Sequence, residues 1–278
     1  MNLSSLQYPK GDPLYGDFAI LKNAVNFTTG QRAFRAFRIL REPLDYLNSQ
    51  GRAYLSLEGF EQFIVTLEDL QGWIFVLHRW DPGAQVDRSL FGLLDTTRVG
   101  VGQFSEEAAL ELVKSLDPTG YRNLIHLPPS EELLKAGFPE TAVKGLSIEM
   151  APQLEGLTRA IEIRGDNERA FVKAYNKSKH LLLGILRMDQ DKPVIALRTA
   201  YSYKSSPISL DGADLGCEAS DVRRRAYQTI HSQAVLNHIL SLILWTRYGE
   251  ELETPPWVES SLHLPGLRDT TDEETTEV

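Results

Sequence analysis

The chain has 278 residues, 42% of them hydrophobic and 24% charged, which is typical of a globular protein with a sizeable core. Its formal net charge of −9 argues against a protein that coats nucleic acid indiscriminately. The last ten residues hold five acids and no base, so the other 268 residues carry 29 bases and 33 acids. A local basic surface is therefore still compatible with the composition.

The cysteine content and the apolar segments bear on the cellular compartment. The single cysteine, Cys217, excludes an internal disulfide bond. The N-terminal stretch MNLSSLQYPKGDPLYG does not resemble a secretory signal, and the longest apolar stretch, residues 234–245, is interrupted by three polar residues. These features predict a cytoplasmic protein without a membrane span.

The N-terminal third is expected to contain an arm and one kinked helix. Residues 1–27 are punctuated by prolines and glycines and are expected to be irregular. A helix should then run from residue 28 or 29 to Gly51, with a kink at Pro43. Its predicted buried stripe is Phe34, Phe37, Leu40, Leu44 and Leu47, and its four arginines are Arg32, Arg35, Arg38 and Arg41. Because their spacing drifts by about 60° per step, we interpret the arginines as ion-paired or solvated rather than as an RNA-binding patch.

Helical periodicity recurs along most of the remaining chain, in the segments 56–80, 105–116, 118–127, 167–186 and 221–248, with a further short helix from Ser130. Residues 148–163 have only a weak pattern. Residues 193–203 alternate with a period of two and are followed by a turn, which predicts a β-hairpin over about 193–210. The expected fold class is mainly α, a helical bundle with a small inserted β-hairpin. Residues 28–267 would form this single domain, and residues 268–278 a disordered acidic tail.

Two short polar strings are candidate functional sites. In the first, Tyr121-Arg122-Asn123-Leu124-Ile125-His126, the arginine and the histidine are four residues apart and would share one face of a helix. The second lies in the helix expected over 167–186. There, Arg169, Lys173, Asn176 and His180 recur at helical spacing beside an apolar stripe. This polar line is either a solvated helix face or part of a phosphate-binding groove.

Together, the first string and Tyr175-Asn176-Lys177-Ser178-Lys179-His180 resemble the HEPN superfamily of helical-bundle proteins, over an architecture of about residues 56–249. The resemblance implies a metal-independent endoribonuclease of toxin–antitoxin or phage-defence type, dimeric, with its site near the dimer interface. It implies catalytic roles for Arg122, His126 and His180. It also implies that RNA or a nucleotide is bound by Asn123, Lys173, Asn176 and Lys179.

These residue types match the chemistry of RNA cleavage by the 2′-hydroxyl group. That reaction needs a base, an acid and cations on the phosphate, and histidine and arginine supply these without a metal. No residues have metal-ligand spacing, and we expect neither a metal nor another cofactor.

Two alternatives stay open at this stage. The spacing between Arg122 and His126 is shorter than in the family's nuclease motif, which favours a non-catalytic HEPN-like module that binds a nucleotide, RNA or a protein partner. A purely structural role for both strings is the other alternative.

Overall fold

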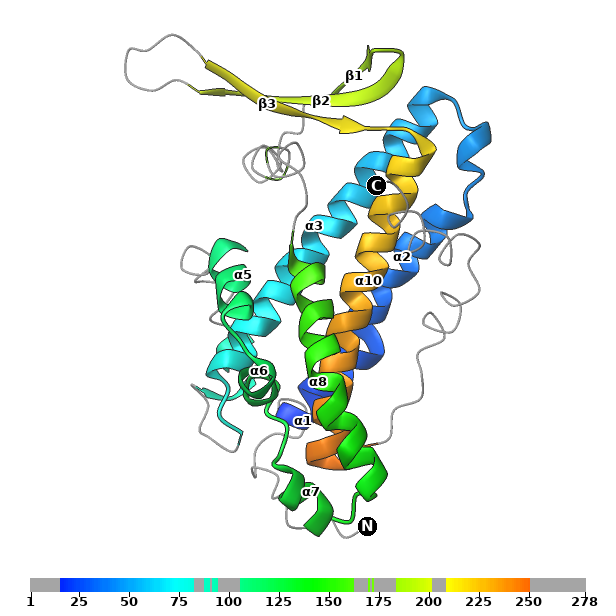
Figure 1. Ribbon diagram of the computed structural model, residues 1–278. Coiled ribbons are helices and arrows are strands. Elements are labelled where there is room, and N and C mark those ends of the chain that lie inside the picture. Colours follow the sequence, from blue (N-terminus) through cyan, green and yellow to red (C-terminus); the bar gives the residue numbers. More distant parts are fainter. Residues whose placement is uncertain are drawn as a thin grey trace, which may run out of the picture.

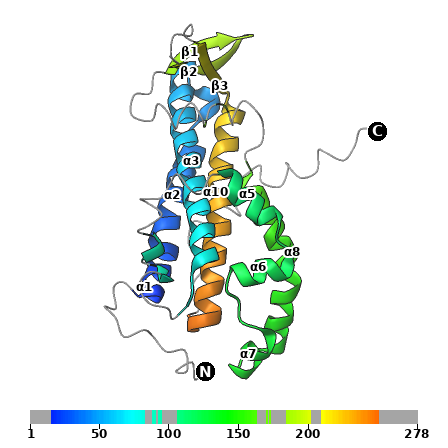
Figure 2. The same ribbon diagram turned by 90° about the vertical axis from the view of Figure 1, so that its left-hand side faces the viewer.

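The computed structural model describes residues 16–82, 88–90, 92–94, 106–162, 170, 172, 184–201 and 209–250. Within these ranges the chain is mainly helical with one small antiparallel sheet, which confirms the expected fold class. Three long helices lie side by side, the sheet lies across one of their ends, and a further long helix packs beside them together with the shorter helices that precede it in the chain (Figure 1). Turning the molecule by 90° shows the same layout, with the three long helices in one layer (Figure 2).

The helices and strands have the following bounds: α1 Asp17–Asn23, the π-helix η1 Ala24–Thr28, α2 Thr29–Arg41, the 3-10 helix η2 Leu44–Tyr46, α3 Ser49–Arg79, α5 Glu106–Lys114, α6 Pro118–Leu124, α7 Ser130–Lys135, α8 Glu140–Ile161, β1 Gly184–Asp189, β2 Lys192–Tyr201, β3 Ser209–Gly216, α10 Ala219–Ile243 and the π-helix η4 Leu244–Tyr248. The segment expected to be weakly patterned is thus mostly the second half of the 22-residue helix α8.

The prediction of an irregular arm over residues 1–27 is wrong for Asp17 onward. Helix α1 begins directly after Gly16, where the series of prolines and glycines ends. The buried Asp17 carboxylate accepts hydrogen bonds from Trp80 Nε1 at 2.8 Å and from the backbone N–H of Leu90 at 2.9 Å. These contacts to distant residues hold α1 on the bundle, and the local sequence does not reveal them.

The kinked helix expected up to Gly51 is two separate helices. Helix α2 ends at Arg41, two residues before Pro43, because proline cannot continue the hydrogen-bond ladder. The chain turns through η2, and Asn48 then caps α3 by accepting a hydrogen bond of 2.8 Å from the N–H of Gly51. Gly51 therefore lies in the first turn of α3 and does not end the preceding helix.

Phe34, one residue of the stripe predicted to be buried on α2, faces solvent instead of the core. Phe34 is 59% exposed, whereas the buried residues of the helix are Thr29, Ala33, Ala36, Phe37 and Ile39. Part of this side packs against Val222, Ala226 and Ile230. The small alanines let the backbone of α2 come close to α10, so the helix is oriented by its small residues and not by its largest one.

The helix expected over residues 167–186 does not continue to its predicted end. Ala170 and Val172, the described residues before Gly184, are helical, but β1 begins at Gly184 and pairs antiparallel with β2. Gln190 and Asp191, both with positive φ, form the two-residue turn between these strands. The predicted hairpin corresponds to β2 and β3, and β1 is a third strand that the sequence pattern did not indicate.

The sheet is attached to the bundle through its inner face. Ile195, Ala213, Leu215 and Cys217 pack against α3 side chains, namely Ala53, Phe60, Phe63, Ile64 and Leu67. On the other face, Arg187 of β1 reaches diagonally across β2 to Asp214 of β3, with 2.5 Å between Nη2 and Oδ2. The main core lies farther along the bundle and joins α3, α8 and α10 to the shorter helices.

Polar side chains buried on α10 fix how its neighbours are placed. Gln233 donates to Thr66 Oγ1 of α3 at 3.1 Å, and Ser232 donates to the Ala160 carbonyl of α8 at 3.0 Å. Asn237 Nδ2 donates to the Val25 carbonyl at 3.1 Å and to Thr29 Oγ1 at 2.9 Å, where η1 meets α2. Each bond is satisfied at one axial position of the neighbouring helix only, so together they set the register of the bundle.

Candidate functional site

The first polar string lies at the end of α6. Asp117 caps this helix by accepting a hydrogen bond of 2.6 Å from the N–H of Gly120, and Pro118 is its first residue, as the sequence predicts. The helix ends at Leu124, however, three residues before the predicted end. The N–H of Leu127 bonds to the Arg122 carbonyl at 3.1 Å and that of His126 to the Asn123 carbonyl at 3.0 Å. This pattern is a Schellman motif, which stops a helix.

His126 occupies the left-handed position of this motif, with φ of 52°. Arg122 and His126 therefore do not share a helix face, because the histidine lies beyond the end of the helix. Glycine or asparagine usually fills this position, since a Cβ atom is unfavourable there. Contacts of the imidazole with other helices must offset the backbone cost.

The half-buried imidazole of His126 packs into the junction of α6 with α3 and η4. Its Nε2 donates to the Leu77 carbonyl at 2.7 Å, so this nitrogen carries the proton of the neutral ring. The ring lies edge-on to Trp80, with centroids 4.8 Å apart. The His126 carbonyl accepts a hydrogen bond of 2.9 Å from Nε of Arg247. Three elements are thus linked through this one residue.

The electrostatics favour the neutral form of the ring. Burial lowers the pKa of His126, and the guanidinium of Arg247 acts in the same direction, whereas the Leu77 carbonyl and Asp81 oppose them. A general acid or base must exchange protons near neutral pH. The neutral form and the engaged Nε2 make this histidine less available for such exchange.

The two neighbours of His126 in the string lie in different environments. Arg122 is half-buried, burial lowers its pKa, and its Nη2 donates to the Pro128 carbonyl, which closes the loop after α6. Asn123 is exposed on the last turn of the helix. The structure therefore does not direct Arg122, Asn123 and His126 at one common point, and their functional roles stay predictions.

The second string lies outside the described residues. Lys173, Asn176, Lys179 and His180 all fall within 173–183, so the structure does not bring them together with the first string or separate them from it. In the described part of the chain, no group of three or more His, Cys, Asp or Glu side chains could hold a metal ion. His231 and His238 of α10 each have a pKa lowered by burial.

A second candidate surface lies on α2 and on η1, which directly precedes it. Phe27 and Phe34 are 63% and 59% exposed, and Arg35, Arg38 and Arg41 are exposed beyond them. We call these five residues the α2 outer face. On an ideal helix Phe34, Arg38 and Arg41 lie within about 60° of one another, and Arg35 and Arg41 are roughly 9 Å apart along the axis.

Ion pairing distinguishes the arginines of α2 from one another. Arg32 is paired, with its Nε 2.5 Å from Asp69 Oδ2. Among the residues that the structure describes, no carboxylate lies within ion-pair distance of Arg35, Arg38 or Arg41. Of the four arginines that the sequence led us to interpret as ion-paired or solvated, Arg32 is paired and the other three are exposed to solvent. The sequence analysis did not identify the exposed phenylalanines beside the solvated arginines, because the apolar periodicity assigned Phe34 to the core.

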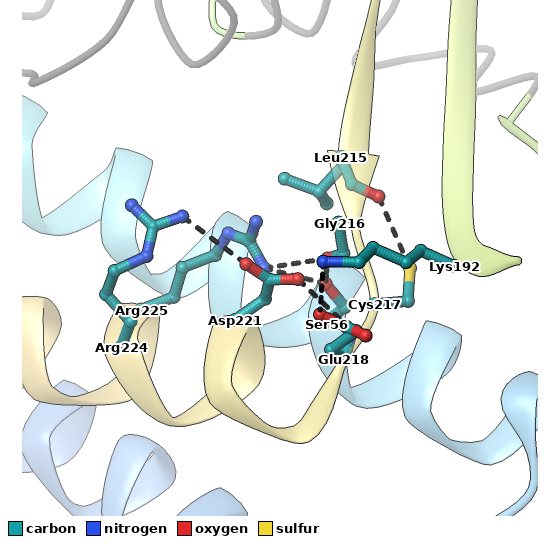
Figure 3. Close-up of polar contacts among 9 residues, drawn as sticks. All are labelled: Ser56, Lys192, Leu215, Gly216, Cys217, Glu218, Asp221, Arg224 and Arg225. Carbon is teal, nitrogen blue, oxygen red and sulfur yellow. Dashed lines mark hydrogen bonds and ion pairs between the residues drawn. The ribbon is translucent and has the colours of Figure 1, made fainter. Parts of the chain in front are cut away.

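A third polar cluster joins the sheet to the helices (Figure 3). Arg225 of α10 is only 2% exposed and donates to Ser56 Oγ at 2.8 Å and to the Gly216 carbonyl at 3.0 Å, while Ser56 donates to the same carbonyl at 2.7 Å. The buried Cys217 thiol donates to the Leu215 carbonyl at 3.4 Å, and burial raises its pKa. These bonds fill the joint, so we interpret it as structural.

Comparisons with known proteins do not assign the chain to a family. The chain matches no protein-family model, no curated protein and no solved structure. Among the helices that the structure describes, none has the length and apolar character needed to cross a membrane. The first polar string and the α2 outer face are therefore the two features of the chain from which a function can be inferred.

Proposed function

We propose that the protein is a non-catalytic, HEPN-like helical module that binds single-stranded RNA through the α2 outer face. The observation that carries this proposal is the combination, on one exposed helix face, of two phenylalanines and three arginines without an ion-paired carboxylate in the described residues.

These residue types suit single-stranded nucleic acid. Arginine presents a planar fork of donors to phosphate oxygens, and an exposed aromatic ring is a platform on which a base can stack. Stacking tolerates any base, so the module would have little sequence preference. The net charge of −9 restricts such binding to a local patch, and the three arginines form one.

The contacts of His126 support the non-catalytic form of the proposal. Its Nε2 is engaged with the Leu77 carbonyl, and burial lowers its pKa. Arg122, its intended partner in phosphate binding, donates to the Pro128 carbonyl of its own loop. Both side chains stabilise the end of α6, which is a sufficient reason for their presence in the string.

Fluorescence anisotropy with a fluorescein-labelled single-stranded RNA of about 20 nucleotides tests the proposal. Replacing Phe34 by Ala should weaken binding about 5-fold or more, because base–aromatic stacking is worth roughly 1–3 kcal/mol. The triple variant Arg35→Gln/Arg38→Gln/Arg41→Gln should also flatten the dependence of log Kd on log salt by about 2, since each lost phosphate contact accounts for about 0.7 on single strands.

A matched triple variant controls for net charge. Lys135→Gln/Lys144→Gln/Arg159→Gln removes three exposed cations from α7 and α8 and should leave RNA binding nearly unchanged. Equal weakening by both triple variants, or no binding by the wild-type chain, would refute the proposal. A denaturing gel of the same samples gives the other outcome: RNA cleavage that His126→Ala and His180→Ala both abolish would identify an endoribonuclease instead.

A further inference from the structure

The described chain ends beside α1, about two helical turns before the start of α2. Lys22 of α1 forms an ion pair with Glu250, and the rings of Phe18 and Tyr248 lie 5.3 Å apart. Both views show α1 next to the end of α10 (Figures 1 and 2). Phe27 follows Lys22 by five residues, which is about 7.5 Å of helix. The segment after Glu250 therefore starts close to the phenylalanine end of this face.

The remaining chain, residues 251–278, has a composition that complements the face. It contains eight acids and one arginine, and five of the acids fall in the last ten residues. The apolar residues Leu252, Trp257, Val258, Leu262, Leu264 and Leu267 precede this acidic end. Apart from Glu251, Glu253 and Glu259, which lie among the apolar residues, the apolar residues thus come first and the acids last. The face has the same order with increasing distance from Glu250, with phenylalanines first and arginines last.

The segment is long enough to reach the arginines. From Lys22 to Arg41 the helical path is roughly 28 Å. Residues 251–268 span up to about 60 Å when extended, and a flexible chain of this length has an r.m.s. end-to-end distance of about 23 Å. A flexible tether of this length would give the acidic end a high effective concentration near the arginines.

We propose that residues 251–278 bind back onto the α2 outer face, with the acids of 269–278 on Arg35, Arg38 and Arg41 and the preceding apolar residues on Phe27 and Phe34. The segment needs no fold of its own, because charge attraction and burial of the two rings hold it. Its regulatory consequence rests on the proposed function: the acidic end occupies the site of the RNA phosphates and lowers the apparent RNA affinity until RNA displaces it.

A distance measurement tests the docking without any RNA. Spin labels are attached to Tyr46→Cys, which replaces a 92% exposed side chain just beyond α2, and to Val278→Cys, while the native Cys217 is buried. Double electron–electron resonance on the full chain in about 50 mM salt should give a population of short distances. This population should disappear in about 1 M salt, where the Debye length falls to roughly 3 Å.

Charge variants assign the contact to the named residues. The short distances should be lost in Arg35→Glu/Arg38→Glu/Arg41→Glu and kept in Lys135→Gln/Lys144→Gln/Arg159→Gln. They should return when the first variant also carries lysine in place of Asp269, Asp272, Glu273, Glu274 and Glu277. Recovery of the short distances would show that the three-glutamate variant had lost the contact and not its fold.

Two results would overturn the docking: a broad distance distribution that neither salt nor charge changes, or short distances that persist in the three-glutamate variant. RNA titration then separates the two proposals. A further variant neutralises the tail on the wild-type background, with Asn in place of Asp269 and Asp272 and Gln in place of Glu273, Glu274 and Glu277. If the segment docks in the wild-type chain but this variant binds no RNA, the proposed function fails and the docking stands. If docking is absent and RNA still binds to α2, the docking proposal fails and the proposed function stands. Tighter RNA binding after neutralisation supports both.

Discussion

His126 combines an unfavourable backbone conformation with favourable side-chain contacts. A residue other than glycine in the left-handed region costs about 1–2 kcal/mol, and the bond to the Leu77 carbonyl and the packing on Trp80 offset this cost. Asn123, three residues earlier, is exposed and makes no comparable contact with another helix in the described structure. The same short string thus holds one residue linked to the core and one that faces solvent.

This difference predicts how alanine substitutions in the string affect stability. His126→Ala leaves the Leu77 carbonyl without its donor and should lower the free energy of unfolding by about 1–3 kcal/mol. Asn123→Ala is the matched control and should change it by less than about 0.5 kcal/mol. Urea denaturation measures both. Equal and small effects would mean that the imidazole contributes nothing to the junction, and its availability for catalysis would have to be reconsidered.

The lowered pKa of His126 predicts a dependence of stability on pH. In the unfolded chain the imidazole takes up a proton near its ordinary pKa of about 6.5, whereas the folded protein resists protonation to lower pH. As the pH falls from 7 through 6.5, the unfolded state therefore binds more protons and stability decreases. The decrease levels off once the pH is below the folded pKa.

The variant His126→Gln keeps a donor for the Leu77 carbonyl but cannot titrate, so its stability should fall less steeply between pH 7 and pH 5 than that of the wild type. Burial lowers the pKa of His231 and His238 as well, but both remain in the two proteins and cancel in the comparison. Urea midpoints at several pH values provide the test. Parallel curves would contradict it.

At the scale of elements, the sheet is held where β3 passes into α10. Asp221 accepts a hydrogen bond of 3.2 Å from the N–H of Glu218 as part of a capping box, and its carboxylate lies against the Cα of Gly216. A Cβ atom on Gly216 would be 2.8 Å from Asp221 Cγ and closer still to Oδ2. The absence of a side chain on Gly216 lets strand and helix meet at this angle.

Gly216→Ala should therefore destabilise the protein by about 1–3 kcal/mol, because the added methyl group displaces the capping carboxylate. Gly145→Ala in α8 is the opposite case: the added Cβ meets nothing within 4 Å, so the change should stabilise the helix by roughly 0.5–1 kcal/mol. Thermal unfolding of both variants shows whether the first substitution lowers the stability and the second raises it. A Gly216→Ala protein as stable as the wild type would show that the joint adapts easily.

For the whole molecule, the histidines and the arginine of the two polar strings lead to a prediction about cofactors. If the protein cleaves RNA in addition to binding it, these side chains can supply the acid, the base and the cation, so EDTA should leave the rate unchanged. A gel assay of cleavage with and without EDTA, and after addition of Mg²⁺, measures this. Loss of activity in EDTA that Mg²⁺ restores would contradict the histidine-based mechanism.

The acidic C-terminal end should affect binding much more than stability. Exposed ion pairs contribute about 0–1 kcal/mol each and are screened by salt. Deleting residues 268–278 should therefore shift the midpoint of thermal unfolding by no more than a few degrees. Differential scanning calorimetry of the full and shortened chains tests this expectation. A much larger fall would place the segment in the core and not on an exposed face.

The sequence alone was sufficient where the determining interactions are local. Asp117 and Pro118 mark the start of α6, the apolar period of α3 identifies its core residues, and Gly249 with φ of 68° follows the last helix. Caps, helical periods and left-handed glycines act within a few residues along the chain. The fold class and the capped helix of the first polar string therefore followed from the pattern.

Only the tertiary structure decided which surface each helix, strand or side chain packs against. Strand β1 exists because β2 pairs with it, so residues 184–186, the end of the segment expected to be helical, lie in a sheet. Phe34 is exposed because α10 packs against the alanines of α2. His126 lies beyond the end of α6 because its ring bonds to the Leu77 carbonyl and packs against Trp80. Strand pairing, helix rotation and side-chain burial depend on surfaces distant in sequence, and their free energies outweigh local propensity. The exposed aromatic and arginine face of α2 became recognisable only when that packing was known.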